Sequence, residues 1–148
     1  MQRWTSQPLA LPAPAGRIAT AQLELQGVRH GGPSFVFYVF LSGDSEPPPD
    51  DAGRDHERFA GALTVFAHGD CWGGAGHCDW EQGPVSAFDR QPEHHLTPRT
   101  LTVDVTDALK ALGDLDEVVV TIHAAKPSNR DETNVLRFER LALQAYAA

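Results

Sequence analysis

Apolar residues along the chain occur in short runs that predict β-strands. Most of these runs are rich in β-branched or aromatic residues, which favour strands. In one of them Leu101, Val103 and Val105 alternate with polar residues, the pattern of a strand with one buried face. In the last run the apolar phase shifts between Phe138 and Leu141, which suggests a β-bulge. The predicted strands are residues 18–28, 35–41, 59–68, 99–106, 117–124 and 135–147.

One short helix interrupts the strands. Thr106 or Asp107 can cap residues 107–112, and Gly113 ends the segment after one or two turns. Residues 42–57 are acidic, proline-rich and nearly without apolar side chains, so they predict a mobile surface loop. Short strands, turn signals and one short helix together predict an all-β fold, an antiparallel β-sandwich of jelly-roll-like form.

The chain has the length of one domain. Its 148 residues can enclose one ordinary hydrophobic core. Three prolines between Thr5 and Gly16 favour an extended, weakly structured connection. The sequence therefore predicts a linker or lead-in over residues 1–16 and a sandwich domain over residues 17–148.

Charge and hydropathy exclude some partners. The net charge of −8 would repel a phosphate backbone, so nucleic acid is not an expected partner. No apolar run reaches the roughly 20 residues that a bilayer span requires, so no membrane association is expected. Met1 is followed by Gln2, Arg3 and Trp4, and no export signal is visible. Localisation stays open, because the chain could travel bound to an exported partner.

The densest group of chemically distinctive residues lies in a glycine-rich segment, residues 67–80. Cys71 and Cys78 have six residues between them, and a hairpin could bring their sulfur atoms within bonding distance. A disulfide closing so short a loop would stabilise the fold by about 2.5 kcal/mol on the chain-entropy model. Alternatively, thiolates and imidazoles suit Cu(I) or zinc. The candidate metal ligands are Cys71, His77, Cys78 and His68.

The other histidines and the carboxylates give weaker signals. His94 and His95 are adjacent in a polar turn, where an extended backbone would point them in opposite directions. His123 shares its parity with Thr121 and is expected to face solvent or a loop. Carboxylates between Asp44 and Asp55 are expected to be solvated, with a calcium site as the alternative. The nucleophile-elbow, phosphate-loop and dinucleotide motifs are absent, and no catalytic residue is predicted.

Several segments, taken in order, resemble the C-terminal β-domain of tyrosinases and mollusc hemocyanins, which are type-3 copper proteins. The resemblance extends over roughly residues 17–146. Its most specific parts are FAGALTVFAHG at residues 59–69, GHCD at residues 76–79 and TVDVTDAL at residues 102–109.

The resemblance implies that this chain is not an enzyme by itself. In the family, two copper ions are held by histidines of a separate helical domain, and no two of the seven histidines here have the HxxxH spacing. The implied function is that of an accessory domain that covers the copper-site entrance, places a bulky side chain towards the substrate pocket, and modulates access or latency. The implied partner is a helical dicopper domain in cis or in trans, and the chain itself needs no cofactor.

The surface that would meet this partner is a hypothesis. Both parities of residues 35–40 are apolar, which fits a strand covered on one face by the core and on the other by a partner domain or a loop. The interface candidates are Phe35, Phe37, Tyr38 and Phe40. Two other functions stay open: Cu(I) delivery or storage by the Cys71, His77 and Cys78 segment, and a carbohydrate- or protein-binding sandwich with Trp72 and Trp80 as a stacking platform.

Overall fold

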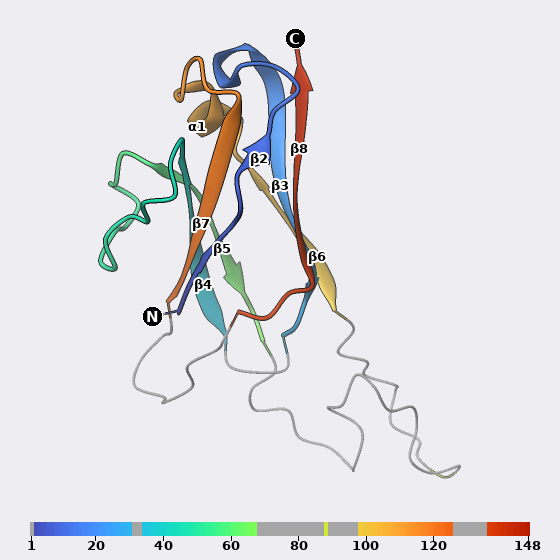
Figure 1. The fold of residues 1–148 in the computed structure, drawn as a ribbon. Helices are drawn as coiled ribbons and strands as arrows, with labels where there is room; N and C mark the ends of the chain where they lie inside the picture. The colour runs from blue at the N-terminus through green and yellow to red at the C-terminus, as the bar shows by residue number, and fades with distance from the viewer. Residues whose placement is uncertain (1, 31–33, 68–87, 89–97, 126–135) are drawn as a thin grey trace.

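The computed structural model describes residues 2–30, 34–67, 88, 98–125 and 136–148, and it forms a two-layer antiparallel β-sandwich (Figure 1). The larger sheet has the strand order β1-β7-β4-β5, and β2 also pairs with β7. The smaller sheet has the order β6-β3-β8. The predicted all-β sandwich with one short α-helix is confirmed. The strands are β1 (Gln2–Thr5), β2 (Leu9–Ala10), β3 (Ile18–Val28), β4 (Phe35–Ser42), β5 (Phe59–Val65), β6 (Arg99–Asp104), β7 (Glu117–Ala125) and β8 (Arg140–Ala147).

One hydrophobic core fills the space between the sheets. In β3, Ala21, Leu23 and Leu25 point inward, as the alternation of apolar and polar residues requires. Four residues of β4 and four of β7 meet them from the other sheet. Each large side chain that is fully buried in this way stabilises the fold by about 1.5–3 kcal/mol. The core residues of β4 and β7 are Phe35, Phe37, Val39, Leu41, Val118, Val120, Ile122 and Ala124.

Most strand bounds agree with the sequence pattern, and the last strand differs. The bounds of β3 are the predicted ones, and β4 is one residue longer than predicted. The final strand was expected from residue 135, but β8 begins at Arg140. The apolar shift between Phe138 and Leu141 therefore marks the entry into the strand and is not a bulge within it. Phe138 packs against Trp4 instead, with ring centroids 5.1 Å apart.

Residues 2–10 belong to the larger sheet and are not a loose connection. Both β1 and β2 pair with β7, and Ser6 lies between them. The N–H of Ser6 donates to the carbonyl of Val120 at 2.9 Å, and the N–H of Val120 donates to the Ser6 hydroxyl at 3.0 Å. Pro8, the proline of residues 2–10, falls between the two strands, at a position where no ladder hydrogen bond is needed. The segment predicted as a linker or lead-in, residues 1–16, thus contains two strands of the sheet, and a role in linking this domain to another stays a prediction.

The short helix α1 (Thr106–Lys110) begins one residue earlier than predicted, with Val105 at the N-cap position. The predicted capping by Thr106 or Asp107 is therefore wrong. The carboxylate of Asp104 accepts the N–H of Thr106 at 2.9 Å, while the Thr106 hydroxyl accepts the N–H of Ala21 in β3 at 2.9 Å. Gly113 adopts a φ of 71° after the helix, which a glycine accommodates without strain. The 3-10 helix η1 (Ala15–Arg17) packs beside α1.

Candidate interaction site

The outer faces of the two sheets differ in chemistry. The smaller sheet presents polar side chains, among them Gln22 of β3, Thr102 of β6 and Gln144 of β8, and all three are exposed. On the larger sheet, Phe40 points outward, because its neighbours Val39 and Leu41 belong to the core, yet only 1% of Phe40 is exposed. The larger sheet therefore carries a covered apolar face on its outside, and this face is the candidate interaction site.

Five rings form a cluster on this face, which we call the outer aromatic cluster. Phe40 lies at its centre, with ring centroids 4.9 Å from His123, 5.7 Å from His56 and 6.2 Å from Phe59. Tyr38 lies 6.2 Å from Phe59. The rings of His56 and Phe59 meet Phe40 nearly edge-on, which aromatic pairs favour over face-to-face stacking. The cluster joins β4, β5, β7 and the segment that precedes β5.

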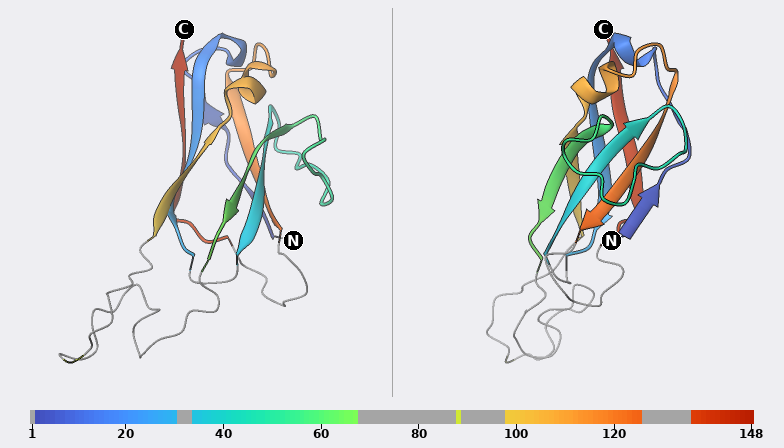
Figure 2. Two further views of the ribbon diagram at one scale, coloured as in Figure 1. Left: turned by 180° about the vertical axis from the view of Figure 1, so that it is seen from behind. Right: turned by 90° about the vertical axis from the view of Figure 1, so that its left-hand side faces the viewer.

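Residues 43–58, which we call the covering loop, connect β4 to β5 and lie over this cluster. In Figure 1 they stand outside the larger sheet, and in the right-hand view of Figure 2 they lie in front of its strands. The loop is made of consecutive turns, with backbone hydrogen bonds from Ala52 to Pro49, from His56 to Gly53 and from Phe59 to His56. The surface position of the predicted loop is confirmed. The two-sided apolar pattern of β4 is explained by the core on one face and, at Phe40, by this loop on the other.

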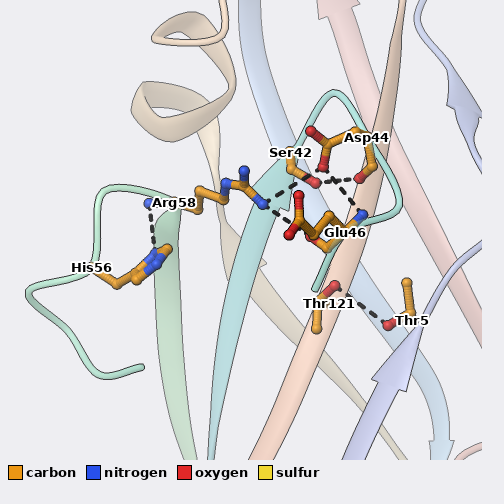
Figure 3. A network of polar contacts seen from close by, with 7 residues as sticks. All are labelled: Thr5, Ser42, Asp44, Glu46, His56, Arg58 and Thr121. Atoms are coloured by element: carbon orange, nitrogen blue, oxygen red, sulfur yellow. Dashed lines mark hydrogen bonds and ion pairs between the residues drawn. The ribbon is translucent and has the colours of Figure 1, made fainter. Parts of the chain in front are cut away.

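A polar network holds the base of the covering loop (Figure 3). The Arg58 guanidinium donates to the carbonyl of Glu46 at 2.9 Å and lies 3.6 Å from the Asp44 carboxylate. The hydroxyl of Ser42, at the end of β4, donates to the carbonyl of Asp44 at 2.5 Å. The backbone N–H of Arg58 donates to Nδ1 of His56 at 3.2 Å, which orients the imidazole towards the cluster. The two ends of the loop are thus joined directly to each other.

Two arginines attach the middle of the loop to the sheet. Arg3 of β1 forms an ion pair with Asp50, and the guanidinium carbon of Arg54 lies 5.9 Å from the centroid of the Tyr38 ring. Both contacts are at the surface, where an ion pair contributes about 0–1 kcal/mol. These two contacts therefore add little to the stability of the loop, whose middle is also held by the buried Pro48 and by His56 against Phe40.

His123 lies at the bottom of this arrangement and is fully buried, with 0% of its surface exposed. Among the described residues, neither ring nitrogen has a hydrogen-bond partner. A buried polar group without a partner costs about 1–3 kcal/mol. Burial, reinforced by the positive charge of Arg3 and by His56, lowers the pKa of His123 below that of a solvated histidine. His123 points to the outer face of the sheet, as its parity predicted, but it does not face solvent: it is covered there and its ring lies against Phe40.

A shallow pocket adjoins the base of the covering loop. Its volume is about 260 Å³, and it is lined by the end of β4, by Glu57 and Arg58, and by Ala108, Ala111 and Leu112 near α1. Ligand pockets are usually 300–1,000 Å³ in volume and hold several convergent polar groups. The pocket is smaller than that, and we assign no ligand to it.

The four predicted interface residues have different environments. Phe35 and Phe37 are buried in the core and are not accessible from outside, whereas Phe40 lies beneath the covering loop and Tyr38 is half-buried. The predicted interface stays a prediction. Because Phe35 and Phe37 are buried in the core, Tyr38 and Phe40 are the two candidates that remain on the outer face. Phe66, which follows β5 and is 83% exposed, was not among the residues predicted to form the interface. The alternation of buried and exposed residues along β5 could have revealed it, because Phe66 lies two residues after the exposed Thr64.

The candidate metal and disulfide residues lie outside the described residues. These are His68, Cys71, His77 and Cys78, and the same holds for His94, His95, Trp72 and Trp80. Within the described ranges, no group of three or more histidine, cysteine or acidic side chains is close enough to hold a metal ion. The carboxylates of the covering loop are all described, and none of them belongs to such a group in this structure. No helix in these ranges has the length and hydropathy to cross a bilayer.

Comparison with solved structures finds the same fold in latent polyphenol oxidases. Latent aurone synthase, a polyphenol oxidase, from its natural source matches with a TM-score of 0.54 and 12% identity over 99% of this chain and 25% of its own. Recombinantly expressed latent aurone synthase gives 0.55 and 13%, with 99% and 24% coverage. Latent apple tyrosinase gives 0.52 and 16%, with 98% and 26% coverage. The chain spans about a quarter of these proteins, and identities this low show a shared fold alone. No protein-family model and no curated protein matches the sequence.

Proposed function

We propose that this chain is a non-catalytic accessory domain that shields the active site of a tyrosinase-like copper oxidase. The observation that carries the proposal is the extent of the structural match. Nearly the whole of this chain matches about one quarter of a latent polyphenol oxidase and of a latent tyrosinase. The oxidation would then be performed by a partner domain corresponding to the other three quarters. The ordered sequence segments that resemble tyrosinase β-domains support the same function independently.

Three large apolar side chains are exposed among the described residues, Phe66, Phe88 and Tyr146, and Phe66 directly follows a strand of the larger sheet. Phe66 follows the buried Val65, and the N–H of Ala67 donates to the Ser34 hydroxyl at 3.0 Å, so both neighbours of Phe66 are fixed. A bulky apolar side chain that is 83% exposed on a fixed backbone loses little conformational freedom when it inserts into a pocket. We assign Phe66 this shielding contact, with Tyr38 as a second contact beside the covering loop.

Activity of a partner domain tests the proposal. A tyrosinase-like helical domain from the same source is assayed for diphenol oxidation alone, mixed with this chain, and fused to it through a cleavable linker. We expect binding and a rate at least tenfold lower in the fusion, with recovery after cleavage and removal of the chain. No binding together with unchanged rates would exclude the accessory function.

A matched pair of variants tests the shielding residue. In the fused protein, Phe66→Ala should restore much of the rate, because an alanine leaves the pocket open to substrate. Tyr146→Ala is the control: Tyr146 is 61% exposed on β8 of the other sheet and should leave the rate low. Equal rates for the two variants would reject the role of Phe66 without rejecting the accessory function.

A further inference from the structure

The outer aromatic cluster encloses a titratable group that the shielding function does not use. His123 of β7 is completely buried, and in the part of the chain that the structure describes neither of its nitrogens has a hydrogen-bond partner. Phe40 packs against its ring at 4.9 Å. A neutral imidazole can be accommodated here, but an imidazolium would be removed from water, with no acceptor among the described residues for either N–H.

The charged and titratable groups around His123 do not compensate such a charge. From β1, Arg3 is its register partner and is itself positive. From β4, the register partner is Tyr38, over which Arg54 of the covering loop lies. From the loop, His56 faces it across Phe40. The acidic group in this set is Asp50, which is paired with Arg3.

We propose that the covering loop is an acid-released cover: protonation of His123 expels residues 43–58 from the outer aromatic cluster and exposes Phe40 and Phe59. The proton comes from solvent and binds a ring nitrogen that then reaches water. Release of the middle of the loop breaks the surface ion pair of Arg3 and Asp50, the Arg54 contact and the packing of His56 on Phe40. The charge on His123 has to outweigh these contacts. The inference concerns this chain alone and does not depend on a partner domain.

The direction of the effect follows from proton linkage. Burial first, and then Arg3 and His56, lower the pKa of His123 while the loop is closed. The open state has an imidazole in water, with an ordinary pKa of about 6.5. Below that pH the open state binds one proton more than the closed state, so the closed population falls as the pH falls. One proton corresponds to about a tenfold increase in the opening equilibrium per pH unit.

Amide hydrogen exchange of the full chain between pH 7.5 and 5 tests the switch. The reporters are peptides from residues 43–58, whose amides include those of His56 and Arg58, and the reference is the core of β3. After correction for intrinsic exchange, protection of the covering loop should fall about tenfold between pH 6 and pH 5. Protection of β3 should not change. A loop whose protection is independent of pH, or a parallel loss in β3, would overturn the proposal.

Two variants identify the responsible group. His123→Phe, or His123→Gln if the larger ring is not tolerated, should abolish the pH dependence of loop protection. His56→Gln removes the other imidazole and should leave that dependence in place. If the dependence survives in the His123 variants, or disappears in His56→Gln alone, His123 is not the switch. Titration of the His123 ring by NMR in the unmodified chain gives a readout that needs no substitution, and a pKa at or above the ordinary value would also refute it.

Discussion

Gly61 of β5 lies against Val103 of β6 across the interior of the sandwich. A Cβ atom added at Gly61 would overlap with Cγ1 of Val103. Val103 is only 6% exposed and belongs to the core. The two edge strands approach each other this closely because position 61 has no side chain. The glycine is thus required by packing, since its backbone φ is not positive.

Gly61→Ala should therefore destabilise the fold. Overpacking a core typically costs 1–3 kcal/mol, so we expect a loss of roughly that size in the free energy of unfolding, measured by urea denaturation. Gly53→Ala is the matched control, because a Cβ there meets only the flexible carboxylate of Asp55 at 3.3 Å. Equal stability of the two variants would show that Val103 can move aside.

Ser6 supplies the second test of the fold, in the segment that joins β1 to β2. Its hydroxyl accepts the N–H of Val120, and Ser6 is 9% exposed. Ser6→Ala leaves that buried N–H without a partner, which should cost about 1–3 kcal/mol in urea denaturation. Ser45→Ala, an exposed position in the covering loop, is the control. A neutral Ser6→Ala would mean that residues 2–10 contribute little to the stability of the sheet.

Asp104 should make the free energy of unfolding depend on pH in the acid range. Hydrogen bonds from the Thr106 side chain first, and from its backbone N–H second, lower the pKa of the Asp104 carboxyl. The folded state therefore binds a proton less readily than the unfolded state. The stabilisation is complete well above the ordinary carboxyl pKa and is lost as the pH falls through that value and then through the lower folded value.

Asp104→Asn should remove this pH dependence. Over that range the midpoint of urea denaturation should fall less steeply in the variant than in the unmodified chain, because asparagine does not titrate. Asp107→Asn, one residue into α1, serves as a comparison for a change of charge at the same helix end. A variant that retains the full slope would assign the acid sensitivity to other carboxylates.

The strand pattern was predictable because each strand has two chemically different faces. Leu23 and Leu25 alternate with Gln22 and Glu24, and no other register of β3 buries the leucines. The pairing of β1 with β7 was not predictable. It joins residues near opposite ends of the chain through main-chain hydrogen bonds, and Pro8, Pro12 and Pro14 nearby favoured an unpaired connection. The helix start was missed because Asp104, two residues before Thr106, accepts its N–H in place of a residue at the cap position.

The candidate site was predictable only in part. The sequence indicated that β4 is covered on both faces and that His123 faces outward, because both follow from period-two alternation. It did not indicate what covers Phe40. That depends on the turns that bring His56 back onto β4 and on the pairing of Asp50 with Arg3, which are contacts between distant parts of the chain. The acidic composition of the loop predicted only that it lies at the surface.

The disulfide between Cys71 and Cys78 stays a prediction from the sequence. The intact mass of the chain, purified without reductant, should be lower by two hydrogen atoms than after reduction. On the chain-entropy model, Cys71→Ser with Cys78→Ser should lower the free energy of unfolding by about 2.5 kcal/mol. If instead the thiols are free and the reduced chain binds one Cu(I) with a stoichiometry that the double variant loses, the segment is a copper-handling site. Those two outcomes exclude each other, because a sulfur atom in a disulfide is not a thiolate ligand.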